Sequence, residues 1–204
     1  MFHGQSLGWT WSQRVHLEIR DAFLMQWKSA TLCGVMSLLP GINFPAVYAK
    51  QYVSVEEVKN IFFHGELLQK VAISIPPHIQ TLIRKESGVR QQLKGTDVWR
   101  SAEGSWLIVD EVVGKHEMIT YAVGIDSAGA IKGIEVMQYN ESYGGQIRER
   151  KWLAQFTGKK VDNRLRLNED ISNITGATLS AKHVTDGVRR VMILYREYLK
   201  GYQG

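Results

Sequence analysis

Residues 106–139 read WLIVDEVVGKHEMITYAVGIDSAGAIKGIEVMQY, and this stretch decides the fold. Apolar and β-branched residues dominate three segments, and two short glycine-containing segments separate them. Such a pattern is typical of β-strands joined by tight turns. Gly133, inside the third segment, indicates a β-bulge or a close approach by another part of the chain. The sequence therefore predicts a three-stranded antiparallel meander over Trp106–Val113, Met118–Ile125 and Ile131–Tyr139.

Segments with helical signals lie on both sides of this meander. Ser54 and Glu57 have the spacing of a capping box at a helix start. Residues 179–199 carry apolar side chains at the spacing of one helix face that packs on a sheet, namely Val184, Val188, Val191 and Tyr195. The predicted fold class is therefore α+β, an antiparallel meander sheet with helices packed on it and a long C-terminal helix. We also expect helices at 54–61, 78–87 and 148–156 and a strand at 67–75.

The composition is that of an ordinary globular chain. The 204 residues are 44% hydrophobic and 22% charged, with a net charge of +5. The basic residues form no stripe interleaved with aromatics, which argues against nucleic-acid binding. The six histidines lack metal-ligand spacing, and no serine has the context of a Ser-His-Asp triad. We therefore expect neither a metal site nor a catalytic residue.

Residues 1–49 differ from the rest of the chain. Lys28 precedes an uncharged stretch, SATLCGVMSLLPGINFPAVYA at 29–49, which ends with Val47 and Ala49 at the −3 and −1 positions of a signal-peptidase site. We expect a cleaved signal peptide, with an uncleaved anchor as the alternative, because about 20 apolar residues span a bilayer. Either places the remaining chain in the periplasm or another extracytoplasmic space, soluble or anchored. The one cysteine, Cys33, lies inside this leader, so no disulfide is expected beyond it.

The run Ile174-Thr-Gly-Ala-Thr-Leu-Ser180 directly precedes the predicted C-terminal helix. A helix N-terminus presents unpaired N–H groups and the positive end of the helix dipole, so it binds phosphate well. Gly176 can adopt the positive φ of a tight turn. The hydroxyl of Thr178 is placed to hold an anion or to be bonded to one. As an alternative, this threonine simply caps the helix.

Two stretches upstream complete the pattern: residues 140–145 read NESYGG, and residues 152–159 read WLAQFTGK. With the ITGATLS run, they resemble the E-T-P-G loop, the W-x-x-x-F-x-G-K stretch and the flavinylation motif D-x-x-S/T-G-A-T of the FMN-binding domain family. That family includes the C subunit of sodium-translocating NADH:quinone reductase and the G subunit of the Rnf electron-transport complex. Tyr143 replaces the usual proline, and Ser172 stands at the acidic position of the motif.

The resemblance implies an FMN cofactor, attached to Thr178 through a phosphoester by a separate flavin transferase. It also places the FMN-binding domain at 98–204, so that the expected organisation is the leader at 1–49, an N-terminal α/β extension at 50–97 and this domain. The other residues expected to contact FMN are Thr175, Gly176, Ala177, Leu179, Ser180, Glu141, Ser142, Tyr143, Gly144, Gly145 and Trp152.

The function expected from the resemblance is that of an exported electron carrier, which relays electrons between a membrane donor and an extracytoplasmic acceptor. Its redox partner would be a membrane electron-transport complex or a cytochrome. An electron-transfer flavoprotein is favoured over a stand-alone enzyme. The alternatives are a flavin-dependent reductase subunit of a larger complex and a non-redox binding module that has lost the cofactor.

Overall fold

The computed structural model describes residues 51–203, which fall in one compact unit. The predicted leader at 1–49, and with it the choice between signal peptide and anchor, lies outside the described residues. Within 51–203, no helix is both long and apolar enough to cross a membrane. Residues 51–97 belong to the same compact unit as the remainder of the described chain.

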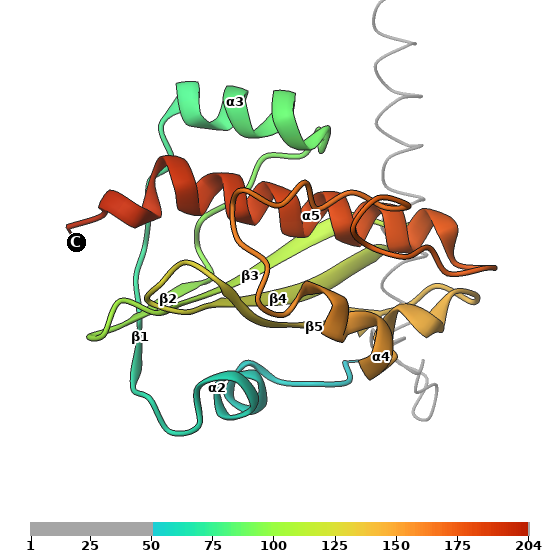
Figure 1. Cartoon of the computed structure of the whole chain (residues 1–204), viewed down its shortest axis with the longest axis horizontal. Helices are drawn as coiled ribbons and strands as arrows, with labels where there is room; N and C mark the ends of the chain where they lie inside the picture. The colour runs from blue at the N-terminus through green and yellow to red at the C-terminus, as the bar shows by residue number, and fades with distance from the viewer. Residues whose placement is uncertain (1–50, 204) are drawn as a thin grey trace, which may run out of the picture. The chain divides into compact units, whose positions relative to one another are not determined.

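A five-stranded antiparallel sheet forms the centre of this unit, and its strands follow one another in chain order (Figure 1). The predicted meander is confirmed as β3 (Trp106–Val113), β4 (Met118–Ile125) and β5 (Ile131–Tyr139). Two short strands extend it at one edge, β1 (Leu68–Lys70) and β2 (Val98–Ser101). The strand predicted over 67–75 is therefore shorter than expected. After Lys70 the chain makes isolated backbone hydrogen bonds, from Val71 to Val98 and from Ile73 to Gly95, instead of a continuous ladder.

Three helices cover the sheet: α3 (Pro77–Ser87) and α5 (Thr178–Glu197) lie on one face, and α2 (Val55–Phe63) lies on the other (Figure 1). The capping box at the start of α2 is present, since the Ser54 hydroxyl accepts from the Glu57 N–H and the Glu57 side chain accepts from the Ser54 N–H. The α+β class and the long C-terminal helix are thus confirmed. All four predicted apolar positions of α5 are buried against the sheet (Val184, Val188, Val191 and Tyr195).

Gly133 marks a close approach and lies next to a bulge, as predicted. It faces Gly124 across β4 and β5, and the register shifts immediately after Gly124. A Cβ at either glycine would lie 2.7 Å from the ring of Phe62 on α2. The two glycines therefore allow the Phe62 ring to pack directly on the sheet, which fixes α2 on this face.

The predicted helix at 148–156 is a series of short turns: a 3₁₀ turn at Gly145–Arg148, α4 (Arg150–Leu153) and a 3₁₀ turn at Ala154–Phe156. Trp152 and Phe156 pack edge to face in the core, with ring centroids 5.2 Å apart. After Gly158, the chain pairs with the start of β5, because Gly158 donates to the Ile131 carbonyl and the Ile131 N–H donates to Lys159. The WLAQFTGK stretch thereby anchors the long connection to α5.

Candidate functional site

A pocket of about 610 Å³ lies where three segments meet: the β3–β4 turn, the loop after β5 and the start of α5. Its volume falls within the range of small-molecule sites. It is lined by Lys115, His116, Glu141, Ser142, Tyr143, Gly176, Ala177, Thr178, Leu179 and Ser180. The structure thus brings together eight of the twelve predicted site residues, although they come from two segments more than 30 residues apart in sequence.

Helix α5 begins at this pocket without a side-chain cap. A turn closed by the Ala177 N–H and the Ile174 carbonyl precedes it, and Gly176 takes a φ of +84° there, as predicted. Ala177 occupies the N-cap position and cannot cap with its methyl group. Thr178 is the first helical residue, so the alternative that it caps the helix is wrong. The first N–H groups of a helix have no partner within it, so this helix start offers donors to an anion.

The hydroxyl of Thr178 is accessible from solvent. Thr178 is exposed, and its Oγ1 accepts a hydrogen bond of 3.2 Å from the side-chain amide of Asn173. The Asn173 carbonyl oxygen in turn accepts from the Ile174 N–H at 2.8 Å. Asn173 therefore orients the hydroxyl at the mouth of the pocket, and it leaves the hydroxyl proton available for another acceptor.

Glu141 holds the β3–β4 turn against the pocket. Its Oε1 accepts hydrogen bonds from the N–H groups of His116 (2.6 Å) and Glu117 (3.1 Å). Burial raises the pKa of the Glu141 carboxyl, but the backbone donors at the turn outweigh this and hold the pKa below its ordinary value. The carboxylate is thus engaged in positioning Lys115 and His116, rather than being available as an acid or base.

Tyr139, at the end of β5, ties the loop that follows it to α5. Its hydroxyl donates to the Tyr143 carbonyl and lies 3.1 Å from the Ser180 hydroxyl. Burial raises the pKa of the Tyr139 phenol above its ordinary value, so the group stays neutral. Gly144 is buried behind the pocket, where a side chain would overlap this hydroxyl. Tyr139 therefore connects the loop after β5 to the start of α5.

Two large apolar side chains at the rim of the pocket are exposed. Tyr143 is 86% exposed and Leu179 is 48% exposed, and both line the pocket. Lys115 and His116, both exposed, supply polar groups on the opposite segment. Aromatic and aliphatic side chains beside a helix N-terminus suit a ligand that combines a flat ring system with a phosphate.

Four predicted residues do not line the pocket: Thr175, Gly144, Gly145 and Trp152. Thr175 is exposed in the turn before α5, and Gly145 begins the 3₁₀ turn after the loop. Trp152 is only 5% exposed, and its Nε1 donates to the Ser172 carbonyl at 2.8 Å. This indole thus supports the segment that leads to the motif.

Ser172, at the acidic position of the motif, has both backbone groups bonded and its side chain at the surface. Its N–H donates to Gln155 Oε1 at 2.8 Å, and its carbonyl accepts from Trp152. The nearest acid, Asp170, accepts from the N–H groups of Leu165 (2.9 Å) and Arg166 (2.7 Å). Burial raises the Asp170 pKa, but these donors and Lys159 lower it overall. Asp170 thus stabilises its own turn.

The sequence did not identify Lys115, His116, Tyr139 and Asn173. Lys115 and His116 reach the pocket only because Glu141 binds their turn, which is a contact across 25 residues of sequence. Asn173 carried a usable signal, because an asparagine beside a tight turn often bonds to neighbouring backbone groups. Over residues 51–203, no cluster of three or more acidic, histidine or cysteine side chains has the arrangement of a metal site.

Comparison with known proteins identifies the segment that contains this pocket. Residues 114–192 match the FMN-binding domain family. This part of the chain is an FMN-binding domain. Every residue that lines the pocket lies within the match. The chain is also 24% identical over 210 residues to the G subunit of the Na(+)-translocating ferredoxin:NAD(+) oxidoreductase complex of Acetobacterium woodii, a match that covers 90% of this chain and all of that protein.

FMN is accordingly the cofactor of this domain, and the pocket fits it. The uncapped start of α5 offers N–H donors for the phosphate, and the apolar rim at Tyr143 and Leu179 offers contacts for the ring. Thr178, the first residue of α5, lines the same pocket as Tyr143 and Leu179. The matched domain makes the protein a flavoprotein, and its relationship to the G subunit indicates a role in electron transport.

Proposed function

We propose that this protein is an electron carrier whose FMN is attached to Thr178 through a phosphoester. The observation that carries the proposal is the exposed hydroxyl of Thr178 at the uncapped start of a 20-residue helix. A phosphate at that hydroxyl would lie at the positive end of the helix dipole, next to the first N–H groups of α5. The attached phosphate would fix one end of the cofactor, and the pocket lining would orient the other.

We assign the attachment to a separate enzyme, because no basic side chain of residues 51–203 is bonded to the Thr178 hydroxyl, although Lys115 and His116 line the same pocket. A threonine hydroxyl is a weak nucleophile that needs activation by a neighbouring base. Asn173, its hydrogen-bond partner, has no basic group at neutral pH. His183 lines a different pocket, with Val112 and Val113, and its Nδ1 is buried. We therefore assign deprotonation of the hydroxyl to a flavin transferase.

The transfer of FMN to Thr178 is chemically balanced when FAD is the donor. The Thr178 oxygen forms a bond to the phosphorus of the FMN half, and the bond between that phosphorus and the AMP oxygen breaks. AMP leaves with the electron pair, and the hydroxyl proton passes to the base of the transferase. The exposed position of Thr178 and the open turn at Gly176 give such an enzyme access to the oxygen.

Bound FMN supplies one- and two-electron transfer, and the protein supplies binding, orientation and tuning of the potential. In the described pocket, Glu141 is the one carboxylate, and it is engaged with the β3–β4 turn. The basic groups of the lining, Lys115 and His116, lie on that same turn. Exposed apolar groups at the rim, Tyr143 and Leu179, would keep the ring edge close to a docked redox partner.

For partner and location, we propose a membrane oxidoreductase complex and an extracytoplasmic domain. The related Acetobacterium woodii protein is named as the G subunit of a Na(+)-translocating oxidoreductase complex, which supports a subunit role here. The uncharged stretch at 29–49, after Lys28, supports export. The same relationship favours one second candidate, a flavin-dependent reductase subunit that acts within such a complex.

The test is the intact mass of the full chain, expressed with and without a flavin transferase. The proposal expects the mass of FMN minus water only when the transferase is present, with bound flavin that survives acid precipitation. Loss of all flavin on acid precipitation would reject the covalent link. The isolated, flavin-loaded chain should exchange electrons with small redox dyes but reduce no added metabolite. The reductase candidate instead predicts catalytic reduction of a metabolite.

A further inference from the structure

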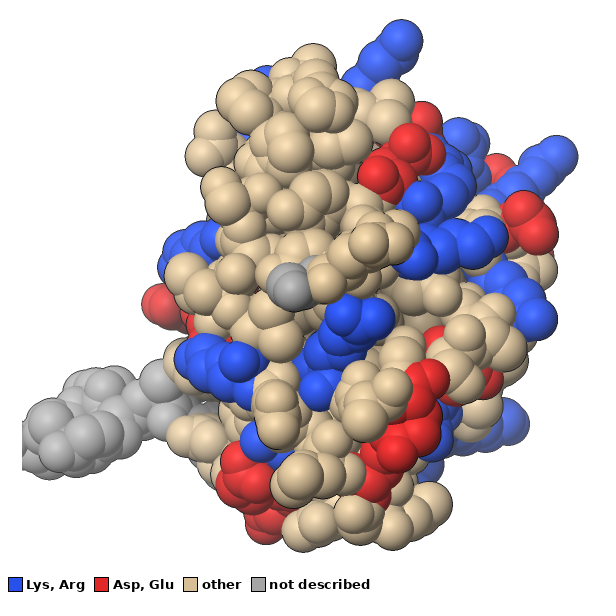
Figure 2. Space-filling view, turned by 90° about the vertical axis from the view of Figure 1, so that its left-hand side faces the viewer, with Lys and Arg blue, Asp and Glu red and all other residues tan. Residues whose placement is uncertain are grey.

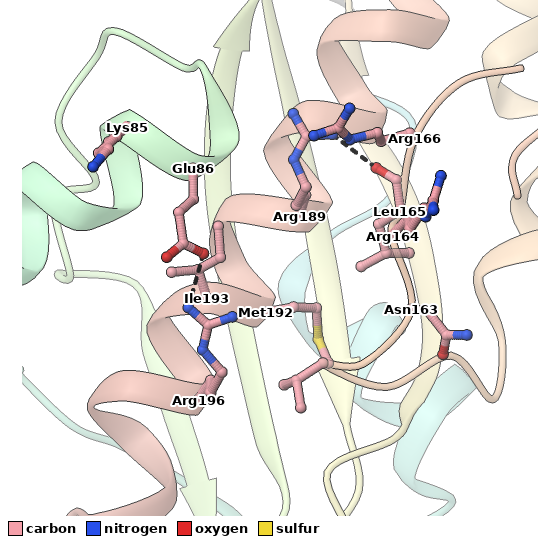
Figure 3. Close-up of a pocket in the computed structure, with 11 residues that line it drawn as sticks. Lys85, Glu86, Asn163, Arg164, Leu165, Arg166, Arg189, Met192, Ile193 and Arg196 are labelled. Carbon is pink, nitrogen blue, oxygen red and sulfur yellow. Dashed lines mark hydrogen bonds and ion pairs between the residues drawn. The ribbon is translucent and has the colours of Figure 1, made fainter. Parts of the chain in front are cut away.

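A second pocket, of about 620 Å³, lies between α3, α5 and the connection at 161–166, and no residue of it belongs to the flavin pocket (Figure 3). Its lining carries five cationic side chains but only one carboxylate, that of Glu86. Met192 and Ile193 of α5 form part of its floor and are only 2% and 5% exposed (Figure 3). The cationic residues are Lys85, Arg164, Arg166, Arg189 and Arg196.

The cationic groups come from three different segments that converge on one hollow. Lys85 belongs to α3, Arg189 and Arg196 to α5, and Arg164 and Arg166 to the connection (Figure 3). On the face drawn in Figure 2, Lys and Arg side chains form several groups, with Asp and Glu among them. A solvated helix surface would alternate charge along one element, whereas here like charges from three elements meet.

Some of these charges are already paired. Arg196 contacts Glu86 at 2.8 Å, and Arg164 contacts Glu169, outside the pocket, at 2.8 Å. Arg189 is structural, because it pairs with Asp186 at 2.7 Å and donates to the carbonyls of Ser87 (2.6 Å) and Leu165 (3.1 Å).

Two of the cationic side chains have hydrogen-bond donors that the described residues leave unused. Arg166 has one long contact, 3.8 Å to Glu169, and Lys85 has no partner among the described residues. The Nε of Arg189 is also buried without an acceptor, so even the structural guanidinium has an unused donor. Carboxylates in and beside the pocket therefore pair with three of the five cations, and Lys85 and Arg166 keep donors for a ligand.

We propose that this pocket binds a phosphate ester that carries an apolar group. Guanidinium groups match phosphate oxygens with paired donors, and a lysine adds a compact charge. The half-buried side chain of Val161 and the aliphatic parts of the arginine side chains provide apolar contacts for the organic part of such an ester. The concave shape favours a small molecule or a lipid headgroup over a flat protein surface. The phosphate ester is thus either a soluble monoester or the headgroup of an anionic phospholipid, and the experiment separates these two sources.

The test uses the full chain and two variants that each remove two positive charges. The pocket variant is Lys85→Gln with Arg166→Gln, because these side chains make the fewest contacts with the rest of the protein. The matched control is Lys94→Gln with Lys151→Gln, whose residues line neither pocket. The soluble probe is hexyl phosphate, measured by calorimetry beside inorganic phosphate. The lipid probe is sedimentation with phosphatidylcholine vesicles that contain phosphatidic acid.

The proposal expects saturable binding of hexyl phosphate, tighter than that of inorganic phosphate, and weakened about tenfold or more in the pocket variant. The control should stay within about twofold of wild type, since surface charges elsewhere contribute little. Binding to vesicles without binding of hexyl phosphate would assign the pocket to a lipid headgroup. Equal losses in both variants, binding that the pocket variant leaves unchanged, or no binding of either probe would overturn the proposal.

Discussion

The side-chain amide of Asn173 donates a 3.2 Å hydrogen bond to the hydroxyl of Thr178, across the turn that begins helix α5. The bond links the last residue before the turn to the first residue of the helix, and Gly176 between them takes a positive φ. It fixes the rotamer of an otherwise exposed side chain, because a threonine side chain at a surface has few other restraints. The hydroxyl of this pocket-lining residue is therefore held in one orientation before any cofactor is attached.

Thr178→Ala should abolish covalent FMN and leave the fold intact. The substitution removes the only oxygen proposed to carry the phosphate, and Thr178 is exposed, so its effect on stability should be within about 0.5 kcal/mol. The intact mass after expression with a transferase measures the modification. Thr178→Ser should keep it, and Thr175→Ala, which removes an exposed hydroxyl three residues earlier, should also keep it. A full FMN adduct on Thr178→Ala would contradict the assignment.

Ser172→Asp should increase the flavinylated fraction when the transferase is limiting. It restores the acid of the family motif at an exposed position whose backbone is already held by Trp152 and Gln155. Asp170→Ala is the comparison, because its carboxylate stabilises the turn at 165–171. Asp170→Ala should lower the melting temperature and leave the initial rate of flavinylation of the folded protein nearly unchanged. If Asp170→Ala lowers that rate and Ser172→Asp changes nothing, Asp170 supplies the recognition acid instead.

The main strands and helices could be predicted because each carries a local signal. The meander follows from apolar runs and glycine turns, and α5 follows from one apolar face. Strands β1 and β2 have three and four residues, and they are stabilised by pairing with each other and with β3 rather than by a pattern of their own. Such short strands depend on the sheet that they join, so their sequences contain little evidence of them.

The flavin pocket was predictable on the two segments that carry motifs, and not on the third. Ser142, Tyr143 and the residues from Gly176 to Ser180 were identified and do line the pocket. Lys115 and His116 were not, because their turn is held by a carboxylate far along the chain. Trp152 illustrates the opposite case. Its motif is local and recognisable, yet its indole bonds to the Ser172 carbonyl and does not line the pocket.

Glu141→Gln should destabilise the protein at neutral pH and much less in acid. The folded-state pKa of Glu141 lies below the ordinary 4.5, so its ionised form stabilises the fold above about that pH. This contribution is lost as the pH falls through the lowered pKa. Urea unfolding across a pH series measures the difference in free energy of unfolding between wild type and variant. Glu117→Gln, on the same turn, is the control. A difference that stays constant down to acid pH would show that the charge is irrelevant.

Export should be visible in the mature protein. Cleavage after Ala49 would leave a chain that begins at Lys50, recovered from the soluble envelope fraction. The anchored alternative keeps residues 29–49 and recovers the protein from membranes with an intact N-terminus. Both outcomes place Thr178 outside the cytoplasm, where the transferase and FAD must then be available. Fractionation with N-terminal sequencing decides between them, and full-length protein in the cytosol would contradict export.

Arg190→Met and Asp110→Asn should each destabilise the fold by about 3–5 kcal/mol, because each leaves part of a buried ion pair without its partner. Arg190 is fully buried in α5, and its guanidinium lies 2.6 Å from Asp110 on β3. It also donates to the carbonyls of Gln91 and Glu111. Burial, and then the charge of Asp110, raise the pKa of Tyr121 well above its ordinary value, so this phenol donates to Asp110 as a neutral group.

These contacts join α5, whose first turn carries Thr178, to the sheet. The double variant should therefore cost less than the sum of the two single variants, since the second substitution removes a charge that the first has already left unpaired. Lys94→Met provides the comparison, because its contact with Glu111 is 3.4 Å long and exposed, and it should change the free energy of unfolding by at most about 1 kcal/mol. Strict additivity of Arg190→Met and Asp110→Asn would mean that the two residues stabilise the fold independently. Flavinylation of the two single variants should then fall only as far as their folded fraction does, because neither residue lines the flavin pocket.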